Sequence, residues 1–181
     1  MNLEKPSPLA ARFIINEVTP SEIVEWAITS LQQGISTPTL PVVAGYTSTE
    51  LAGSLQNFRT DVTKVFHELG LTIPSEKEAQ IIFACYLCEG ILNKSIPEDA
   101  GLLKLYELWR NANYRPELSS DINLRPFMYI TNSLENIEIG EISLIKGLTK
   151  DNYSDHLRQE CINYLAVEKN LPESLQTSTD E

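Results

Sequence analysis

The amino-acid sequence predicts an all-α fold, an irregular bundle of about six to eight helices around a buried central helix at about residues 76–93. Closely spaced helix start and stop signals are the first observation behind this prediction. Thr19 and Glu22 have the spacing of a capping box, in which each side chain accepts a hydrogen bond from the other residue's backbone amide. Gly34 is the residue type that ends helices in a left-handed conformation, so a helix is expected over residues 20–33.

Apolar periodicity between residues 49 and 69 is the second observation. The apolar positions advance mostly by alternating steps of four and three residues, the spacing of one helical face. They are Leu51, Leu55, Phe58, Val62, Val65, Phe66 and Leu69. Thr47 and Glu50 form a second capping box at the start of this segment, and Lys64 and Glu68 are spaced for an ion pair on its outer side. One long helix is therefore expected here.

The third observation is a segment, Ile81 to Cys88, that is apolar on every side of a helix. A helix that is apolar all round is buried all round. Ser75 and Glu78 supply another capping box just before it, which favours a helix over a buried strand. This helix is expected to form the centre of the bundle.

The remaining elements are predicted from caps, prolines and shorter apolar faces. Further helices are expected at about residues 8–16, 97–110, 126–134 and 152–169. Residues 137–148 are ambiguous, because Ile137 and Ile139 alternate as in a strand whereas Gly140 breaks the pattern; a short helix or an irregular segment is expected. The predicted domain organisation is a single helical domain over 1–172 and a flexible polar tail over 173–181.

Charge and composition argue against several classes of function. The 181 residues include 25 acids and 14 bases, which leaves a formal net charge of −11. Binding to nucleic acid or to an anionic membrane surface needs a basic patch, so neither partner is expected. No signal-peptide pattern opens the sequence, and its longest apolar run is too short to cross a bilayer. The sequence therefore predicts a soluble cytoplasmic protein.

The acidic residues are unevenly distributed. No Lys or Arg lies between Arg12 and Arg59. The candidate partner-binding residues in this acidic N-terminal third are Glu22, Glu25, Tyr46 and Glu50. A second acidic stretch runs through Glu135, Glu138 and Glu141. The negative electrostatic potential of such acidic clusters keeps a protein soluble, and it also accelerates the approach of a basic partner.

The residues capable of metal or redox chemistry are few. Cys85 and Cys88 have the C-x-x-C spacing, but they lie inside an apolar helix, whereas redox pairs begin at an exposed helix N-terminus. A zinc site would need two more ligands, and only Cys161 and His156 are near in type. Cys85 and Cys88 are interpreted as two buried core thiols, and neither a metal nor another cofactor is expected.

One stretch resembles a helical hairpin of many uncharacterised bacterial all-helical proteins. Its pattern is Trp26-Ala27-x-x-x-Leu31-x-x-Gly34 followed by Thr37-x-x-Leu40-x-x-x-Ala44-Gly45. Pro41 departs from the good helix formers of that pattern and predicts a short second helix. The resemblance implies a small helical protein without an assigned activity. Some proteins of this type are suspected immunity or partner proteins of toxins, so the resemblance is also a reason to test for a protein partner.

Three hypotheses for function remain open. The first is a non-enzymatic protein-binding module that docks a basic partner on its acidic surface. The second is a small-molecule carrier or enzyme with a pocket between helices near Trp26, Tyr46 and Trp109. The third is a structural homo-oligomer. Whether any reaction is catalysed is left open, although the absence of recognisable phosphate-loop, nucleophile-elbow and metalloprotease motifs disfavours an enzyme.

Overall fold

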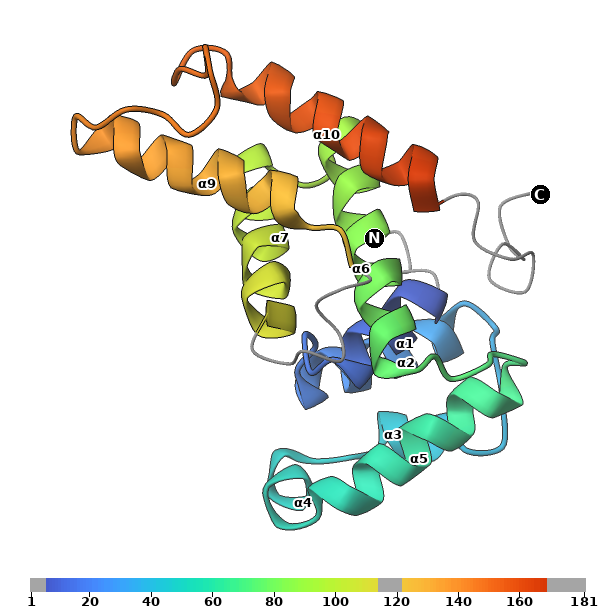
Figure 1. Cartoon of the computed structure of the whole chain (residues 1–181). Coiled ribbons are helices and arrows are strands. Elements are labelled where there is room, and N and C mark those ends of the chain that lie inside the picture. Colours follow the sequence, from blue (N-terminus) through green and yellow to red (C-terminus); the bar gives the residue numbers. More distant parts are fainter. Residues whose placement is uncertain (1–5, 114–121, 169–181) are drawn as a thin grey trace. The chain divides into compact units, whose positions relative to one another are not determined.

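The computed structural model describes residues 6–113 and 122–168, and all regular elements in these ranges are helices (Figure 1). The predicted all-α fold class is therefore confirmed. The tail predicted over 173–181 lies outside the described residues. Contacts divide the chain into two compact units, residues 1–82 and 83–181, and each is described here by itself. The single domain predicted from the sequence stays a prediction.

Nine helices make up the described part of the chain. The N-terminal unit contains α1 (Pro6–Ile14), α2 (Pro20–Gln32), α3 (Leu40–Ala44), α4 (Ser48–Gly53), α5 (Leu55–Glu68) and the first turns of α6 (Glu76–Leu92). The C-terminal unit contains the rest of α6, α7 (Glu98–Asn113), α9 (Arg125–Glu138) and α10 (Tyr153–Glu168). None of these helices is both long enough and apolar enough to cross a membrane.

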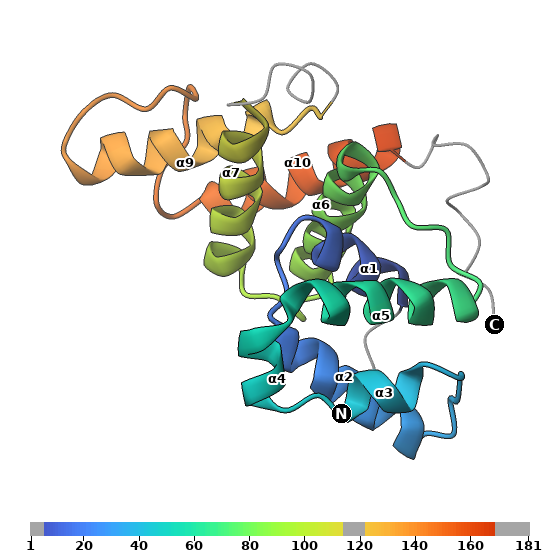
Figure 2. The ribbon, with the colours of Figure 1, turned by 90° about the horizontal axis from the view of Figure 1, so that it is seen from below.

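One apolar core holds the N-terminal unit together. α3 packs against both α2 and α5 (Figure 2). Phe66 of α5 is fully buried, and its ring lies 5.8 Å from the ring of Phe13 and 6.1 Å from that of Trp26. Aromatic pairs at this separation add to the free energy gained by burying their apolar surface. The consecutive helices α1 and α2 are thus joined to the later helix α5 at one side chain.

The prediction of a single helix over residues 49–69 is wrong, because the structure has two helices there. α4 ends at Gly53 and α5 begins at Leu55, and Ser54 between them has φ −150° and ψ 56°, outside the helical region. Glycine lowers the stability of a helix interior, and serine competes for backbone hydrogen bonds. Apolar residues continue across the break at helical spacing, so periodicity alone does not reveal it.

Glu68 has a different role from the ion pair that its spacing suggests. Its carboxylate accepts hydrogen bonds from the amide of Thr39, at 2.9 Å, and from the hydroxyl of Thr39, at 2.6 Å. These bonds lower the pKa of Glu68. The side chain therefore joins the start of α3 to the end of α5, while Lys64 pairs with Asp61 at 3.4 Å.

Helix α6 is largely buried, as predicted, and its central position in the bundle stays a prediction. Its apolar residues from Ala79 to Ile91 are buried or half-buried, and Glu89 is exposed. The capping box is also present: the carboxylate of Glu78 accepts from the amide of Ser75 at 2.8 Å, and the amide of Glu78 donates to the hydroxyl of Ser75 at 3.3 Å. The helix starts where the sequence predicts.

In the C-terminal unit, α9 packs against both α7 and α10. α7 approaches α6 closely at Gly101, where a Cβ atom would lie 2.6 Å from the side chain of Ile91. Between α9 and α10, residues 139–152 form an irregular segment with turns, one of the two alternatives expected. Gly140 opens this segment with φ +82°, a conformation that costs glycine little.

Candidate functional site

The acidic residues predicted to bind a partner occupy helix starts. The Glu22 carboxylate accepts the amide of Thr19 at 2.7 Å and the guanidinium of Arg12 at 3.2 Å. Burial raises the pKa of Glu22, but the hydrogen bonds from Thr19 and the charge of Arg12 outweigh it and leave the pKa below its usual range. Glu25 is exposed one turn further along α2. Glu22 therefore helps to cap α2 as well as carrying surface charge.

Glu50 and Tyr46 also make local contacts. Glu50 accepts from the amide of Thr47 at 2.9 Å, and this capping lowers its pKa. Tyr46 is half-buried: its hydroxyl donates to Asp61 at 2.9 Å, and its ring meets Phe58 edge-on at 5.1 Å. Burial and the Asp61 contact raise the pKa of Tyr46. Tyr46 is thus anchored to α5 rather than free in a loop.

The residues predicted to line a pocket are packed in two different units. Trp26 is buried in the N-terminal core against Phe66, and its indole N–H has no hydrogen-bond partner among the described residues. Trp109 belongs to the C-terminal unit, where it is half-buried and stacks on Tyr106 with ring centroids 5.7 Å apart. Neither tryptophan, nor Tyr46, lines the two hollows described next.

A hollow of about 280 Å³, the Arg59 pocket, opens in the N-terminal unit where the α1–α2 connection meets α5. Its floor is apolar and closed, because Phe13, Ile23 and Phe58 are all buried. Leu55 lines the same hollow but is 51% exposed. The hollow therefore combines a water-excluding floor with an apolar side chain that remains open to solvent.

Arg59 is the charged residue of this pocket. One nitrogen of its guanidinium donates to the side-chain oxygen of Asn16 at 2.8 Å, and the guanidinium carbon lies 4.7 Å from the centre of the Phe13 ring. Among the described residues Arg59 forms no ion pair. The guanidinium is held in place by one neutral acceptor and one aromatic face, and most of its five N–H donors have no acceptor among the residues that the structure describes.

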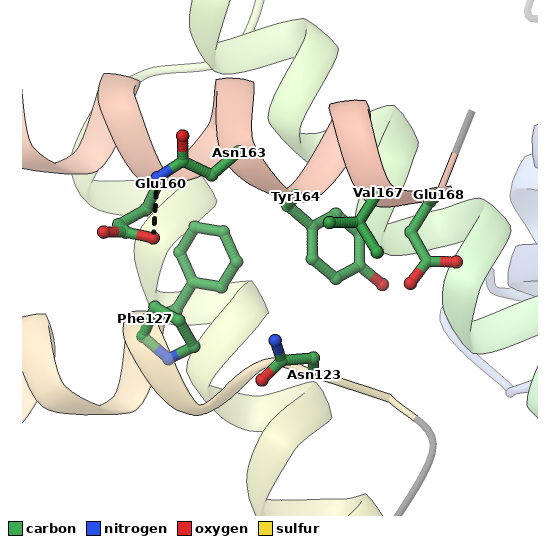
Figure 3. Close-up of a pocket in the computed structure, with 8 residues that line it drawn as sticks. Asn123, Phe127, Glu160, Asn163, Tyr164, Val167 and Glu168 are labelled. Atoms are coloured by element: carbon green, nitrogen blue, oxygen red, sulfur yellow. Dashed lines mark hydrogen bonds between the residues drawn. The ribbon is translucent and has the colours of Figure 1, made fainter. Parts of the chain in front are cut away.

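A second, smaller hollow of about 70 Å³ lies between the start of α9 and the end of α10 (Figure 3). Phe127 and Tyr164 meet there edge to face, with ring centroids 6.0 Å apart. Glu160 and Asn163 are joined by a hydrogen bond of 3.4 Å on the α10 side. The hydroxyl of Tyr164 is buried without a hydrogen-bond partner in the described structure, and burial raises its pKa.

The thiols lie next to this tyrosine. Cys88 of α6 and Cys161 of α10 are both buried, and their side chains contact each other. That contact, followed by burial, raises the pKa of Cys88, the opposite of what a nucleophilic thiolate needs. No group of three or more His, Cys, Asp or Glu suited to a metal ion occurs within the described ranges. The geometry supports the interpretation of Cys88 as a buried core thiol, whereas Cys85, expected to be buried as well, is only half-buried.

The segment after α9 exposes more apolar surface than its surroundings. Ile139, Ile142 and Leu144 are 70%, 89% and 55% exposed. The acidic residues of the second stretch, Glu135, Glu138 and Glu141, are exposed beside them in sequence. We call residues 135–144 the acidic–apolar segment. Exposed apolar side chains with polar neighbours are the kind of surface that protein-interaction sites use.

Sequence reasoning identified the acids of this segment but not its apolar side chains, and it missed the Arg59 pocket. Exposure of Ile142 depends on the irregular path of the chain, which periodicity does not predict. Arg59 was visible only as the first base after a long base-free stretch. Comparisons with protein-family models, with curated proteins and with solved structures find no match to this chain.

Proposed function

We propose that this protein is a non-enzymatic binding module that docks a basic partner protein, and that the acidic–apolar segment is its docking surface. One observation carries the proposal: Ile139, Ile142 and Leu144 are each exposed, and they lie close in sequence to the exposed acids Glu135, Glu138 and Glu141. Covering an exposed isoleucine or leucine contributes about 1.5–3 kcal/mol. A partner that covers all three gains binding free energy that a purely charged surface lacks.

The charges define the partner's chemistry. Glu135, Glu138 and Glu141 favour lysine and arginine on the approaching surface and disfavour acidic surfaces. The apolar side chains require a partner that also presents leucine-like residues. A basic amphipathic helix has both features on one face. Such a helix is the occupant that this segment fits.

A designed peptide tests the proposal directly. The probe is an amphipathic helix with lysine and leucine on one face, and its binding to the full chain is followed by fluorescence anisotropy at low and high salt. Two triple variants remove equal charge. The C-terminal triple variant combines Glu135→Gln, Glu138→Gln and Glu141→Gln. The N-terminal triple variant combines Glu22→Gln, Glu25→Gln and Glu50→Gln. Glutamine retains the hydrogen bonds of a capping box, so the second variant preserves the helix starts.

The proposal expects the C-terminal triple variant to weaken peptide binding about ten-fold and the N-terminal triple variant to change it little. Ile142→Ser should also weaken binding, and its effect should persist at high salt because the contact is apolar. Loss of binding only in the N-terminal triple variant would instead place docking around Glu22, Glu25 and Glu50. Equal losses of peptide affinity in both triple variants would mean that the peptide responds only to net charge, and they would overturn the proposed docking surface.

A photoreactive amino acid at position 142 identifies the natural partner in a cell extract. Position 162 is the matched control, because Ile162 is another exposed isoleucine and lies on α10. Cross-links to a basic protein at 142 and not at 162 support the proposal. Cross-links from 142 to a second copy of the chain would favour a homo-oligomer and contradict it.

A further inference from the structure

We propose that the Arg59 pocket binds a small apolar carboxylate. This site is separate from the acidic–apolar segment and lies entirely in the N-terminal unit. The inference brings together three features: a cation that has no ionic partner in ranges 6–113 and 122–168, an apolar floor of buried side chains and a cavity of small-molecule size.

The cation determines the sign of the ligand's charge. In a chain of net charge −11, a guanidinium is expected to find a carboxylate, yet Arg59 pairs only with the neutral Asn16 among the described residues. The planar guanidinium presents parallel N–H donors that match a carboxylate in a two-pronged hydrogen bond. Its contact with the Phe13 ring holds its plane in place before any ligand arrives. The pocket is therefore preorganised for an anion.

Glu22 does not oppose this assignment. Thr19 lines the pocket, and Glu22 is bonded to Thr19, but the Glu22 carboxylate is directed at the Thr19 amide and at Arg12. Arg12 is thereby placed to neutralise Glu22. Arg59 keeps its positive charge available.

The apolar floor and the volume of the pocket determine the size and the apolar character of the ligand. Phe13, Ile23 and Phe58 offer apolar contacts and little that could bond a second polar group. A hollow of about 280 Å³ is close to the lower end of the range of ligand pockets, roughly 300–1,000 Å³, so it suits a small molecule. Such a ligand would also cover the exposed Leu55. Benzoate and medium-chain fatty acids such as octanoate have this combination of one carboxylate and a compact apolar body.

Titration calorimetry and ligand-observed NMR with benzoate and octanoate test the inference on the full chain. Benzamide and benzylamine are the matched probes without a negative charge. We expect both carboxylates to bind at millimolar or lower concentration and neither control to bind. Absence of binding by both carboxylates at millimolar concentration would overturn the inference.

Variants then assign the binding to this pocket. Arg59→Gln should weaken carboxylate binding about ten-fold or more, because a hydrogen bond to a charged group is lost. Lys64→Gln is the control, since it removes the same charge from an exposed position on the same helix. Leu55→Glu should also weaken binding by placing a negative charge beside the ligand. Circular dichroism verifies that each variant remains helical, and equal binding by native protein and Arg59→Gln would refute the site.

Discussion

Two tyrosines of α10 give a paired test of how the C-terminal unit is stabilised. Tyr164 is 6% exposed, and its hydroxyl has no hydrogen-bond partner in the described residues. Tyr153 lies at the start of the same helix, and its hydroxyl donates to the carboxylate of Asp99 on α7. Replacement of each by phenylalanine removes one oxygen atom and leaves the ring. The structure predicts opposite effects on stability.

Removal of the Tyr164 hydroxyl relieves an unsatisfied buried group, whose desolvation costs about 1–3 kcal/mol. The void that remains is at most methyl-sized and costs about 1 kcal/mol. The ring contact with Phe127 is retained. Tyr164→Phe should therefore stabilise the protein by about 1 kcal/mol, or about 2–4 °C in Tm. Tyr153→Phe should destabilise the protein by about 0.5–1.5 kcal/mol. This is less than a hydrogen bond to a buried carboxylate contributes, because Asp99 is exposed to solvent.

Urea unfolding at neutral pH, followed by far-UV circular dichroism, measures both variants, and calorimetry tests whether unfolding is two-state. Alkaline pH gives a second measurement. The folded-state pKa of Tyr164 is raised above the unfolded value of 10.0, so this group leaves stability independent of pH below pH 10 and lowers it as pH rises further, where the unfolded chain ionises first. Tyr164→Phe should lose less stability above pH 10 than the native chain. A loss of 1 kcal/mol or more in Tyr164→Phe at neutral pH would refute the reasoning, because it would mean that the hydroxyl has a partner.

Three further substitutions test other parts of the fold. Phe66→Ala should destabilise the N-terminal unit by about 3–5 kcal/mol, measured by urea unfolding with far-UV circular dichroism; a loss below 1 kcal/mol would contradict its central place in that unit's core. The pKa of Glu78 is lowered by its hydrogen bonds to Ser75, so its contribution to the free energy of unfolding is present above pH 4.5 and is lost as pH falls. Glu78→Gln should therefore make the loss of stability with falling pH less steep, and an unchanged pH dependence would contradict this. Gly101→Ala should destabilise by about 1–3 kcal/mol through overlap with Ile91; a stabilised variant in thermal melts would show that the two helices can separate easily.

Local signals in the sequence predicted local structure well. The capping boxes beginning at Thr19, Thr47 and Ser75 are all present, because a capping box needs only residues three positions apart. The fold class followed from the same signals together with apolar periodicity. The break at Ser54 was missed, because the apolar spacing is continuous across it and the difference in backbone free energy is small.

The candidate sites were less predictable, because they depend on residues distant in the sequence. Glu22, Glu25 and Glu50 were recognisable as acidic surface positions, and two of them proved to be helix caps. Tyr46 reaches Asp61, and Trp26 reaches Phe66, contacts that depend on how α5 packs on the preceding helices. No spacing rule relates these pairs. The pocket predicted around the two tryptophans therefore does not coincide with either hollow.

By itself the sequence determined that the chain is acidic and helical, and where most helices begin, because charge is additive and a cap is satisfied within one turn. Only the tertiary structure decided that Arg59 would lie against Phe13 above an apolar floor and that Ile142 would remain exposed. These outcomes depend on the packing of whole helices and on the path of irregular segments. The free energy of packing is shared among many distant side chains, so no short stretch of sequence contains it.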